Sequence, residues 1–319
     1  MSTYLLVDCA NTFFRARHVA RYGDVEERVG MAIHVTINAI RKAHKMFGID
    51  KTIYCLEGRS WRKDHYKQYK LNRVENRAKQ SASEQEEDRM FWGAFDDFTT
   101  FIKEKSNATV VRHEHAEADD LIARWIQNHG SDKHVILSSD SDFKQLLKEN
   151  VTIYNGVANE IWNLDGVFDD KMKPVIDKKT KEPKKIEDPE WILFEKCIRG
   201  DPTDNVFSAY PGVRKTKLEE AFNDRNDRGF NWNNLMLQKW VDHDGQERRV
   251  KEEYERNRML IDLTQQPQEI KTAIDEMFAV SKAKPKVAQS GLHFMKFCGR
   301  HGLDKIAENA EQYISIFEK

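Results

Sequence analysis

Acidic side chains recur where predicted strands end, and this pattern constrains the fold more than any other feature. Asp8 closes the apolar run YLLVD, and the other acids flank comparable runs further along the chain. Ligands bind outside the carboxyl ends of parallel strands, so adjacent strands would bring these acids into one crevice. Two carboxylates about 5 Å apart repel by roughly 3 kcal/mol at an effective dielectric constant of about 20. The seven acids are Asp8, Glu57, Glu117, Asp119, Asp120, Asp140 and Asp142.

Cations would relieve this repulsion, and all-oxygen ligands suit Mg²⁺ or Mn²⁺. Simpler explanations exist for some of the acids. Those from Glu117 to Asp120 could be ordinary first-turn acids, and Asp140 could be an N-cap. Asp8 resists such an explanation, because an unpaired charge in a buried strand costs several kcal/mol. A phosphatase of the haloacid-dehalogenase type would need a second aspartate two residues later, where the chain has Ala10.

Strand-like runs alternate with segments of helical periodicity, which predicts an α/β fold with a mainly parallel central sheet flanked by helices. One helix is expected to end at Gly48, and another is expected to run from Glu117 to Gly130. The predicted strands are Tyr4–Asp8, Thr52–Leu56, Thr109–Arg112, His134–Leu137 and Val151–Tyr154.

Two regions depart from this alternation. Residues 58 to about 105 are too long for an ordinary connection between a strand and a helix, so we expect a helical insertion there. The last third has no clear strand run and is predicted to be all-helical. The expected organisation is an α/β domain at 1–190 and a helical domain at 191–319.

The net charge is only −1, but basic residues are unevenly distributed. Residues 59–79 carry eight Lys or Arg against two acids, and residues 171–185 carry seven lysines against two acids. Aromatic residues interleave the first stripe, as in surfaces that bind nucleic acids; the second could equally be a solvated loop.

The sequence has no run of about 18 apolar residues, so no membrane span is predicted. The N-terminus lacks the features of a signal peptide. The four cysteines are scattered along the sequence, which predicts free thiols in a reducing cytoplasm rather than disulfides.

A further acidic and basic group follows residue 199. Asp201 and Asp204 lie three residues apart in GDPTDNV, and a turn with Gly212 then leads to a basic helix start. Such a turn can present backbone N–H groups to a phosphate, although an exposed turn before a capped helix would have the same sequence.

These segments together resemble the 5′-nuclease superfamily of flap endonucleases and 5′→3′ exonucleases, and most closely its stand-alone bacteriophage ribonuclease H type. The resemblance rests on VDCANTFFRA, LEGRSWRKDHYKQYKLNR, HAEADD, SSDSDF and GDPTDNV, in that order. It extends from Tyr4 to about Phe222. It implies a PIN-like α/β domain, a helical arch at about 58–105 and a helix-3-turn-helix element from Gly200 to about Phe222.

The resemblance also implies roles for individual residues. Asp8, Glu57, Glu117 and Asp119 match a first metal site. Asp140, Asp142 and Asp201 match a second, and Asp120 and Asp204 match outer acids. Lys70 and Arg73 match a catalytic pair that reaches the scissile phosphate, and Tyr69 would stack on an unpaired nucleotide. The remaining expected DNA contacts are Asn11, Arg62, Lys63, Lys67, Gly212, Arg214, Lys215, Thr216 and Lys217.

The expected activity is therefore cleavage of branched or nicked duplex DNA and of RNA–DNA hybrids from a 5′ end, with two Mg²⁺ ions that Mn²⁺ can replace. We expect a monomer in the cytoplasm, the host's if the chain is phage-encoded. Candidate partners are a single-strand-binding protein or a clamp, although 308–319 contains no clamp-binding motif. Two departures stand out: Glu57 replaces the usual Asp, and Gly212 is the only glycine of its turn.

Two other functions fit part of the pattern. A PIN-type ribonuclease shares the acidic sheet but is usually shorter and lacks the arch and GDPTDN; it would prefer single-stranded RNA. A catalytically impaired module that binds branched DNA would have lost its metal site, and Glu57 is the one hint of such a loss.

Overall fold

The computed structural model describes residues 1–19, 23–282 and 285–318, which form two compact units. Unit 1 contains Met1–Ser60, Gln80–Ile186 and Pro267–Lys319, and unit 2 contains Trp61–Lys79 and Glu187–Gln266. The predicted boundary near residue 190 is therefore close to an observed one. The prediction of two sequential domains was wrong, because the C-terminal segment completes unit 1 and part of the 58–105 insertion belongs to unit 2.

Unit 1 is built on a seven-stranded sheet with the order β3-β2-β1-β4-β5-β6-β7. The first five strands in this order pair in parallel, and β6 and β7 add to the edge in antiparallel fashion. This confirms the predicted α/β fold, although β6 and β7 were not predicted. The strands are β1 (Thr3–Asp8), β2 (Lys51–Leu56), β3 (Thr109–Arg112), β4 (Lys133–Leu137), β5 (Val151–Asn155), β6 (Glu160–Asn163) and β7 (Gly166–Asp169).

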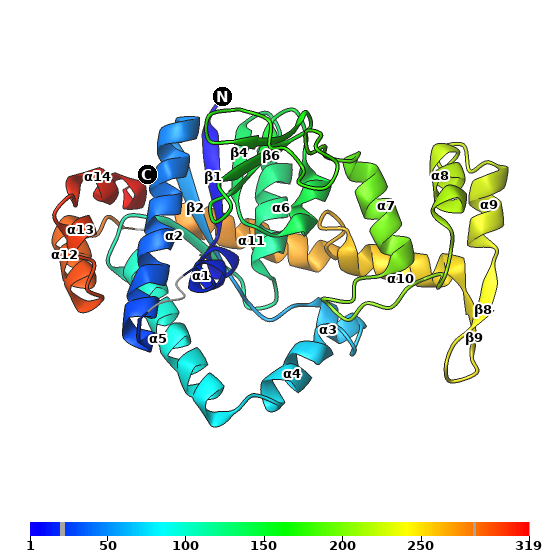
Figure 1. The fold of residues 1–319 in the computed structure, drawn as a ribbon, viewed down its shortest axis with the longest axis horizontal. Coiled ribbons are helices and arrows are strands. Elements are labelled where there is room, and N and C mark those ends of the chain that lie inside the picture. Colours follow the sequence, from blue (N-terminus) through cyan, green and yellow to red (C-terminus); the bar gives the residue numbers. More distant parts are fainter. Residues whose placement is uncertain (20–22, 283–284, 319) are drawn as a thin grey trace. The chain divides into compact units, whose positions relative to one another are not determined.

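Helices cover both faces of this sheet. On one face α2 and α5 run beside each other (Figure 1), and α6 and α11 pack together on the other. The helices of unit 1 are α1 (Cys9–Arg17), α2 (Val25–Phe47), α5 (Ala82–Glu104), α6 (Ala118–Asn128), η1 (Ser141–Leu146), α11 (Gln268–Lys282), α12 (Ser290–Arg300), α13 (Asp304–Ala307), α14 (Glu311–Ile314) and η2 (Ser315–Phe317).

Helix ends largely follow the sequence signals. The carboxylate of Asp24 accepts a hydrogen bond from the Glu27 N–H and caps α2. At its other end Gly48 adopts the left-handed conformation (φ 61°), as predicted. Helix α6 begins after Glu117 as expected, but it ends one residue before the predicted Gly130, at the C-cap His129.

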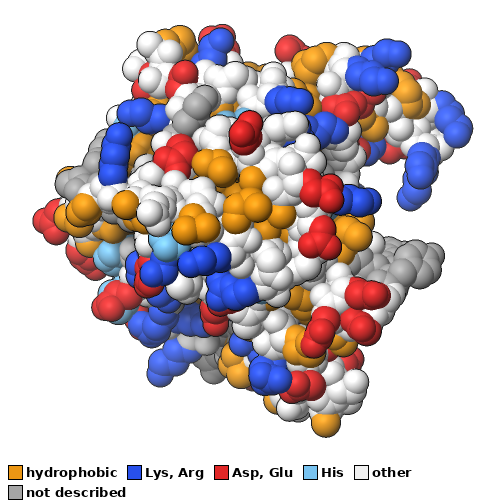
Figure 2. Space-filling model, turned by 90° about the vertical axis from the view of Figure 1, so that its left-hand side faces the viewer, with side chains coloured by type: hydrophobic (Ala, Val, Ile, Leu, Met, Phe, Trp, Pro, Cys, Tyr) orange, Lys and Arg blue, Asp and Glu red, His pale blue; other side chains and the backbone are white. Residues whose placement is uncertain are grey.

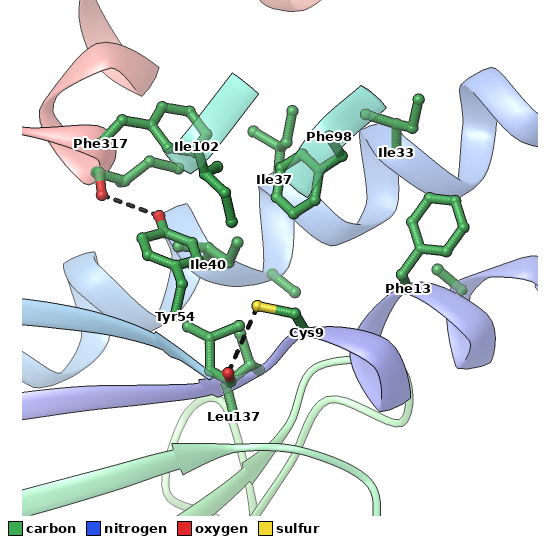
Figure 3. Close-up of a cluster of buried hydrophobic side chains, with 14 of the residues drawn as sticks. Cys9, Phe13, Ile33, Ile37, Ile40, Tyr54, Phe98, Ile102, Leu137 and Phe317 are labelled. Carbon is green, nitrogen blue, oxygen red and sulfur yellow. Dashed lines mark hydrogen bonds between the residues drawn. The ribbon is translucent and has the colours of Figure 1, made fainter. Parts of the chain in front are cut away.

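The C-terminal segment closes the core of unit 1. Phe294, Phe297 and Phe317 are buried in the same cluster as the side chains of β1, β2 and α2. The Tyr54 hydroxyl on β2 donates a hydrogen bond to the Ile316 carbonyl at 3.0 Å (Figure 3). These contacts explain why the C-terminal helices belong to the α/β unit rather than to a separate domain.

Unit 2 is mainly helical. Its helices are α3 (Arg62–His65), α4 (Leu71–Ala78), α7 (Pro189–Arg199), α8 (Lys215–Asn223), α9 (Phe230–Met236) and α10 (Val250–Ile261). A hairpin of β8 (Lys239–Val241) and β9 (Glu247–Arg249) corrects the expectation of an all-helical C-terminal third. The element predicted from Gly200 to about Phe222 contains a turn and helix α8, and helix α7 ends just before it at Arg199.

The side of unit 1 that carries α12 and α13 has mixed charge. Figure 2, which faces the α12–α13 side of the molecule, shows charged side chains of both signs around a central group of hydrophobic ones. All four cysteines are free and buried, as predicted for thiols without a disulfide framework. Among the described residues, no helix is both long and apolar enough to cross a bilayer.

The placement of the C-terminus can be tested by truncating one ring. Phe317 is 2% exposed, and replacing it with alanine should lower the free energy of unfolding by about 3–5 kcal/mol. The matched control is Phe230→Ala, because Phe230 is 80% exposed. Urea denaturation would measure both. A Phe317→Ala loss no larger than that of the control would contradict the packing of this segment into the α/β core.

Candidate metal centre

Asp8 lies where the strand order of the parallel sheet reverses, between β1 and β4. Ligands of open α/β sheets bind at such a switch point. The residue ends β1 and caps α1, because one carboxylate oxygen accepts a hydrogen bond from the Asn11 N–H at 3.1 Å. The other oxygen accepts one from the Ser138 hydroxyl, just after β4, at 3.0 Å. Asp8 is therefore buried between two adjacent strand ends with both oxygens held in place.

The pKa of Asp8 is raised to about 7. Burial is the largest cause, and the negative charges of Glu57 and Asp140 add to it, while the hydrogen bonds from Asn11 and Ser138 lower the pKa. Carboxyl groups from three strand ends therefore repel one another across one site. The predicted convergence of acids is present for β1, β2 and β4.

The segment after β2 is bonded to the loop before α6. The Gly58 N–H donates to the Ala116 carbonyl at 2.9 Å and the Arg59 N–H to the Glu114 carbonyl at 2.7 Å. A Cβ atom at Gly58 would lie 1.9 Å from the His113 carbonyl oxygen, so only glycine permits this approach. Backbone bonding thus fixes where the side chains on either side of this contact point.

Two carboxylates depend on that contact. Glu57 accepts a hydrogen bond from the Ala118 N–H at 3.0 Å, at the start of α6. Glu117 accepts one from the buried Ser60 hydroxyl at 2.6 Å. The longer Glu57 side chain is therefore directed at the α6 N-terminus, whose N–H groups favour a negative charge.

The first turn of α6 brings three acids together. Carboxylate oxygens of Glu117, Asp119 and Asp120 lie within 4.8 Å of one another. Asp120 also accepts a hydrogen bond from the Glu117 N–H at 3.1 Å, completing a capping box. The Glu117 carboxylate accepts the Asp120 N–H in the same box, and Asp119 also accepts that N–H, at 2.7 Å, so local capping involves all three acids of the cluster.

Asp140 and Asp142 begin the short helix η1 after β4. Asp140 caps it by accepting the Asp142 N–H at 2.9 Å. Asn11, predicted as a DNA contact, instead accepts hydrogen bonds from the Ser139 N–H and hydroxyl at 3.0 and 2.8 Å. In this structure Asn11 therefore joins α1 to the loop that carries Asp140.

The donor set fits hard divalent cations. The groups converging on this edge are carboxylates from the ends of β1, β2 and β4 and from the start of α6. Oxygen-only sites of this kind suit Mg²⁺ or Mn²⁺. The raised pKa of Asp8 points the same way, since burial and neighbouring carboxylates both disfavour its ionised form.

Asp201, in unit 2, is already paired. The Lys196 ammonium lies 2.8 Å from its carboxylate, and the Thr203 N–H and hydroxyl donate to it at 2.9 and 2.6 Å. Burial raises the pKa of Asp201, but these partners outweigh burial and lower it overall. A metal ion that used Asp201 would have to compete with Lys196.

The Asp204 carboxylate contacts three side chains of the basic segment of unit 2. Its carboxylate accepts a hydrogen bond from the Tyr69 hydroxyl at 3.0 Å and forms ion pairs with Lys70 at 3.4 Å and Arg73 at 2.6 Å. The Lys70 N–H also donates to the Asp204 carbonyl, and Lys70 adopts a left-handed backbone (φ 56°). The predicted catalytic pair is therefore fixed by Asp204, which the sequence suggested only as an outer metal acid.

Two predicted DNA contacts are corrected by burial. Tyr69 is 4% exposed and packs with Cys197 and Val206, so its ring is not available for stacking in this structure. Arg62 is fully buried, and its guanidinium donates to the Leu260 carbonyl at 2.7 Å. Aromatic and basic residues in one stripe suggested a surface, but both of these side chains belong to the interior of unit 2.

The other predicted DNA contacts keep an accessible position. Gly212 has φ 72°, the left-handed backbone expected of a tight turn. Lys217 is half-buried, with its ammonium 5.4 Å from the Tyr210 ring centre. The exposed members of the set are Lys63, Lys67, Arg214, Lys215 and Thr216.

Sequence reasoning missed the groups that hold the acids. Ser60, Ser138 and Lys196 each contact one predicted ligand, yet none was singled out. The only signal was position, because Ser60 and Ser138 follow the ends of β2 and β4. Lys196 lies five residues before Asp201 on a helix, a spacing that carries no distinctive pattern.

Comparisons with known proteins identify the family of this chain. The family model of the 5′-3′ exonuclease N-terminal resolvase-like domain matches residues 3–173, more than half of the chain. The flap endonuclease of Escherichia phage T5 is 24% identical over 207 residues, which span 63% of this chain and 63% of that protein.

Solved structures show the same fold. A bacteriophage T5 flap endonuclease in a pseudo-enzyme–product complex with DNA and metal ions has a TM-score of 0.62 at 19% identity, covering 88% of this chain and 99% of that one. The T5 5′-exonuclease with bound zinc ions has a TM-score of 0.61 at 20% identity, with 88% and 98% covered. With the match to its N-terminal domain model, the ordered acids and the fold, the chain belongs to the 5′-3′ exonuclease family of 5′-nucleases.

Proposed function

We propose that this protein is a structure-specific 5′-nuclease that uses two Mg²⁺ ions, which Mn²⁺ can replace. Its substrates are 5′ flaps, nicked duplexes and RNA–DNA hybrids, so it removes RNA primers or flaps during DNA replication or repair, as a phage ribonuclease H would. A single-strand-binding protein or a clamp as partner, a monomeric state and a cytoplasmic location stay predictions.

One observation carries the proposal above the family assignment: carboxylates from three strand ends and one helix start lie at the switch point of the sheet, where burial, with the charges of Glu57 and Asp140, raises the pKa of Asp8 to about 7. Asp201 in unit 2, by contrast, is paired with Lys196, and its pKa is lowered. Bound divalent cations would supply water activation and charge stabilisation of the phosphate.

The protein's own residues hold and orient the groups around that chemistry. Asp8, Glu57, Glu117, Asp119 and Asp140 would hold the cations, and backbone N–H groups or serine hydroxyls orient at least one oxygen of Asp8, Glu57 and Glu117. Lys70 and Arg73, aligned by Asp204, would neutralise charge that develops on the scissile phosphate.

Unit 2 offers a surface for the duplex. The turn at Gly212 leads into α8, whose first residues expose Lys215 and Thr216 beside the N-cap Arg214. Backbone N–H groups at a helix start and flanking cations suit phosphates without reading base sequence. Affinity for DNA should therefore fall steeply with added salt.

The family match favours this function over a PIN-type ribonuclease, and the complete acid set weighs against a catalytically impaired module. Glu57 was the one hint of decay, but its carboxylate has a defined partner at the α6 N-terminus. Cleavage of single-stranded RNA in preference to a 5′-flap duplex would favour the ribonuclease instead.

The metal ligands can be tested by removing one carboxylate charge. Asp8→Asn should lower cleavage of a 5′-end-labelled flap in Mg²⁺ by more than the roughly 100-fold upper range for loss of an outer-shell partner. Wild-type protein in EDTA should be equally inactive. Asp96→Asn is the matched control, because Asp96 is exposed on α5. Cleavage by Asp8→Asn at the control rate would refute the catalytic assignment.

The raised pKa of Asp8 predicts a pH dependence of stability without metal. The folded state binds the proton more tightly than the unfolded state, whose pKa is near 3.8. In EDTA, Asp8 therefore does not lower the free energy of unfolding below about pH 4, where it is protonated in both states. Between about pH 4 and pH 7 the free energy of unfolding should fall as the pH rises, by at most about 1.4 kcal/mol per pH unit. Asp8→Asn should remove that part of the decline in urea titrations. An unchanged slope would mean that Asp8 titrates normally.

The basic segment predicts a separation of rate from affinity. Lys70→Ala/Arg73→Ala should lower the single-turnover rate on a 5′-flap by about 10²–10³-fold, because the pair acts on developing charge. The dissociation constant should change far less. Lys63→Ala/Lys67→Ala, in the same segment, should instead weaken binding and reduce its salt dependence. Equal losses of rate and affinity in the first variant would show that the pair only binds DNA.

A further inference from the structure

Two buried hydroxyls contact the acidic cluster from opposite sides. Ser60, after β2, is 2% exposed and donates to Glu117 at 2.6 Å. Ser138, after β4, is also 2% exposed and donates to Asp8 at 3.0 Å. Each serine thus directs one oxygen of a carboxylate that comes from a different loop.

Each serine is itself held by its surroundings. The Ser138 oxygen accepts the Asp140 N–H at 3.1 Å, so one hydroxyl joins Asp8 to the loop that carries Asp140. Ser60 follows Gly58 and Arg59, whose N–H groups are bonded to the loop before α6. Neither hydroxyl can turn away without breaking a buried hydrogen bond.

We propose that Ser60 and Ser138 are positioning residues that keep Glu117 and Asp8 in the geometry needed to bind a divalent cation. The inference rests on the proposed function and extends it to residues outside the ligand set. A carboxylate oxygen tied to a fixed hydroxyl leaves its remaining lone pairs aimed into the site, so little side-chain freedom is lost on binding. Partners of this kind typically contribute 10–100-fold to metal affinity or activity.

The test measures Mn²⁺ binding to DNA-free protein by electron paramagnetic resonance. Ser60→Ala and Ser138→Ala should each raise the dissociation constant by about 10–100-fold. Cleavage of a 5′-flap should need correspondingly more Mn²⁺ for half-maximal rate and recover toward the wild-type rate at saturating Mn²⁺. Ser60→Thr, which keeps the hydroxyl, should bind Mn²⁺ more tightly than Ser60→Ala.

The matched control is Ser106→Ala. Ser106 is 1% exposed, and its hydroxyl donates to the Ile102 carbonyl at the end of α5, so it shares burial but not the acidic cluster. Its variant should bind Mn²⁺ as the wild type does. Thermal unfolding in EDTA checks that the alanine variants fold; a loss of melting temperature in them that exceeds the control and accounts for the weaker binding would overturn the positioning role.

Glu117→Ala separates the two levels of the proposal. If it loses Mn²⁺ binding while both serine variants bind normally, the positioning role is refuted and the metal site stands. If Glu117→Ala also binds Mn²⁺ normally, the proposed function itself fails.

Discussion

Repulsion among carboxylates at the switch point of the sheet is the constraint on which the rest of the site depends. Asp8 is buried, faces the charges of Glu57 and Asp140, and has a pKa near 7. Placing these carboxylates together costs electrostatic free energy, which a bound cation can offset. Perturbed pKa values of this kind are typical of functional sites.

The loops around the site limit how the acids can relax. Gly58 permits a backbone approach that no side chain would allow, and that approach fixes the loops carrying Glu57 and Glu117. Asn11 and Ser138 fasten the β1 and β4 ends in the same way. Without these bonds the carboxylates could move apart to reduce their repulsion. The bonded loops hold them together at one site.

Unit 2 handles its acids differently. Asp201 and Asp204 are compensated by Lys196, Lys70 and Arg73. The same residue type thus has two roles in one chain: ligand-like at the strand ends, where carboxylates face one another, and organiser of cations where lysine and arginine surround it. Sequence patterns do not separate these roles, because both present an aspartate after an ordered segment.

The sequence by itself determined the five parallel strands of the sheet, the acids that follow them and the family. Apolar runs that end in carboxylates are local patterns, so Tyr4–Asp8 and Thr109–Arg112 match β1 and β3 within a residue. Tertiary structure alone decided which side chains are buried and paired. The interior location of Tyr69 and Arg62, the union of the C-terminal helices with the α/β unit, and the hydroxyls of Ser60 and Ser138 all depend on contacts between residues far apart in the chain. Such contacts follow from packing, which local periodicity does not encode.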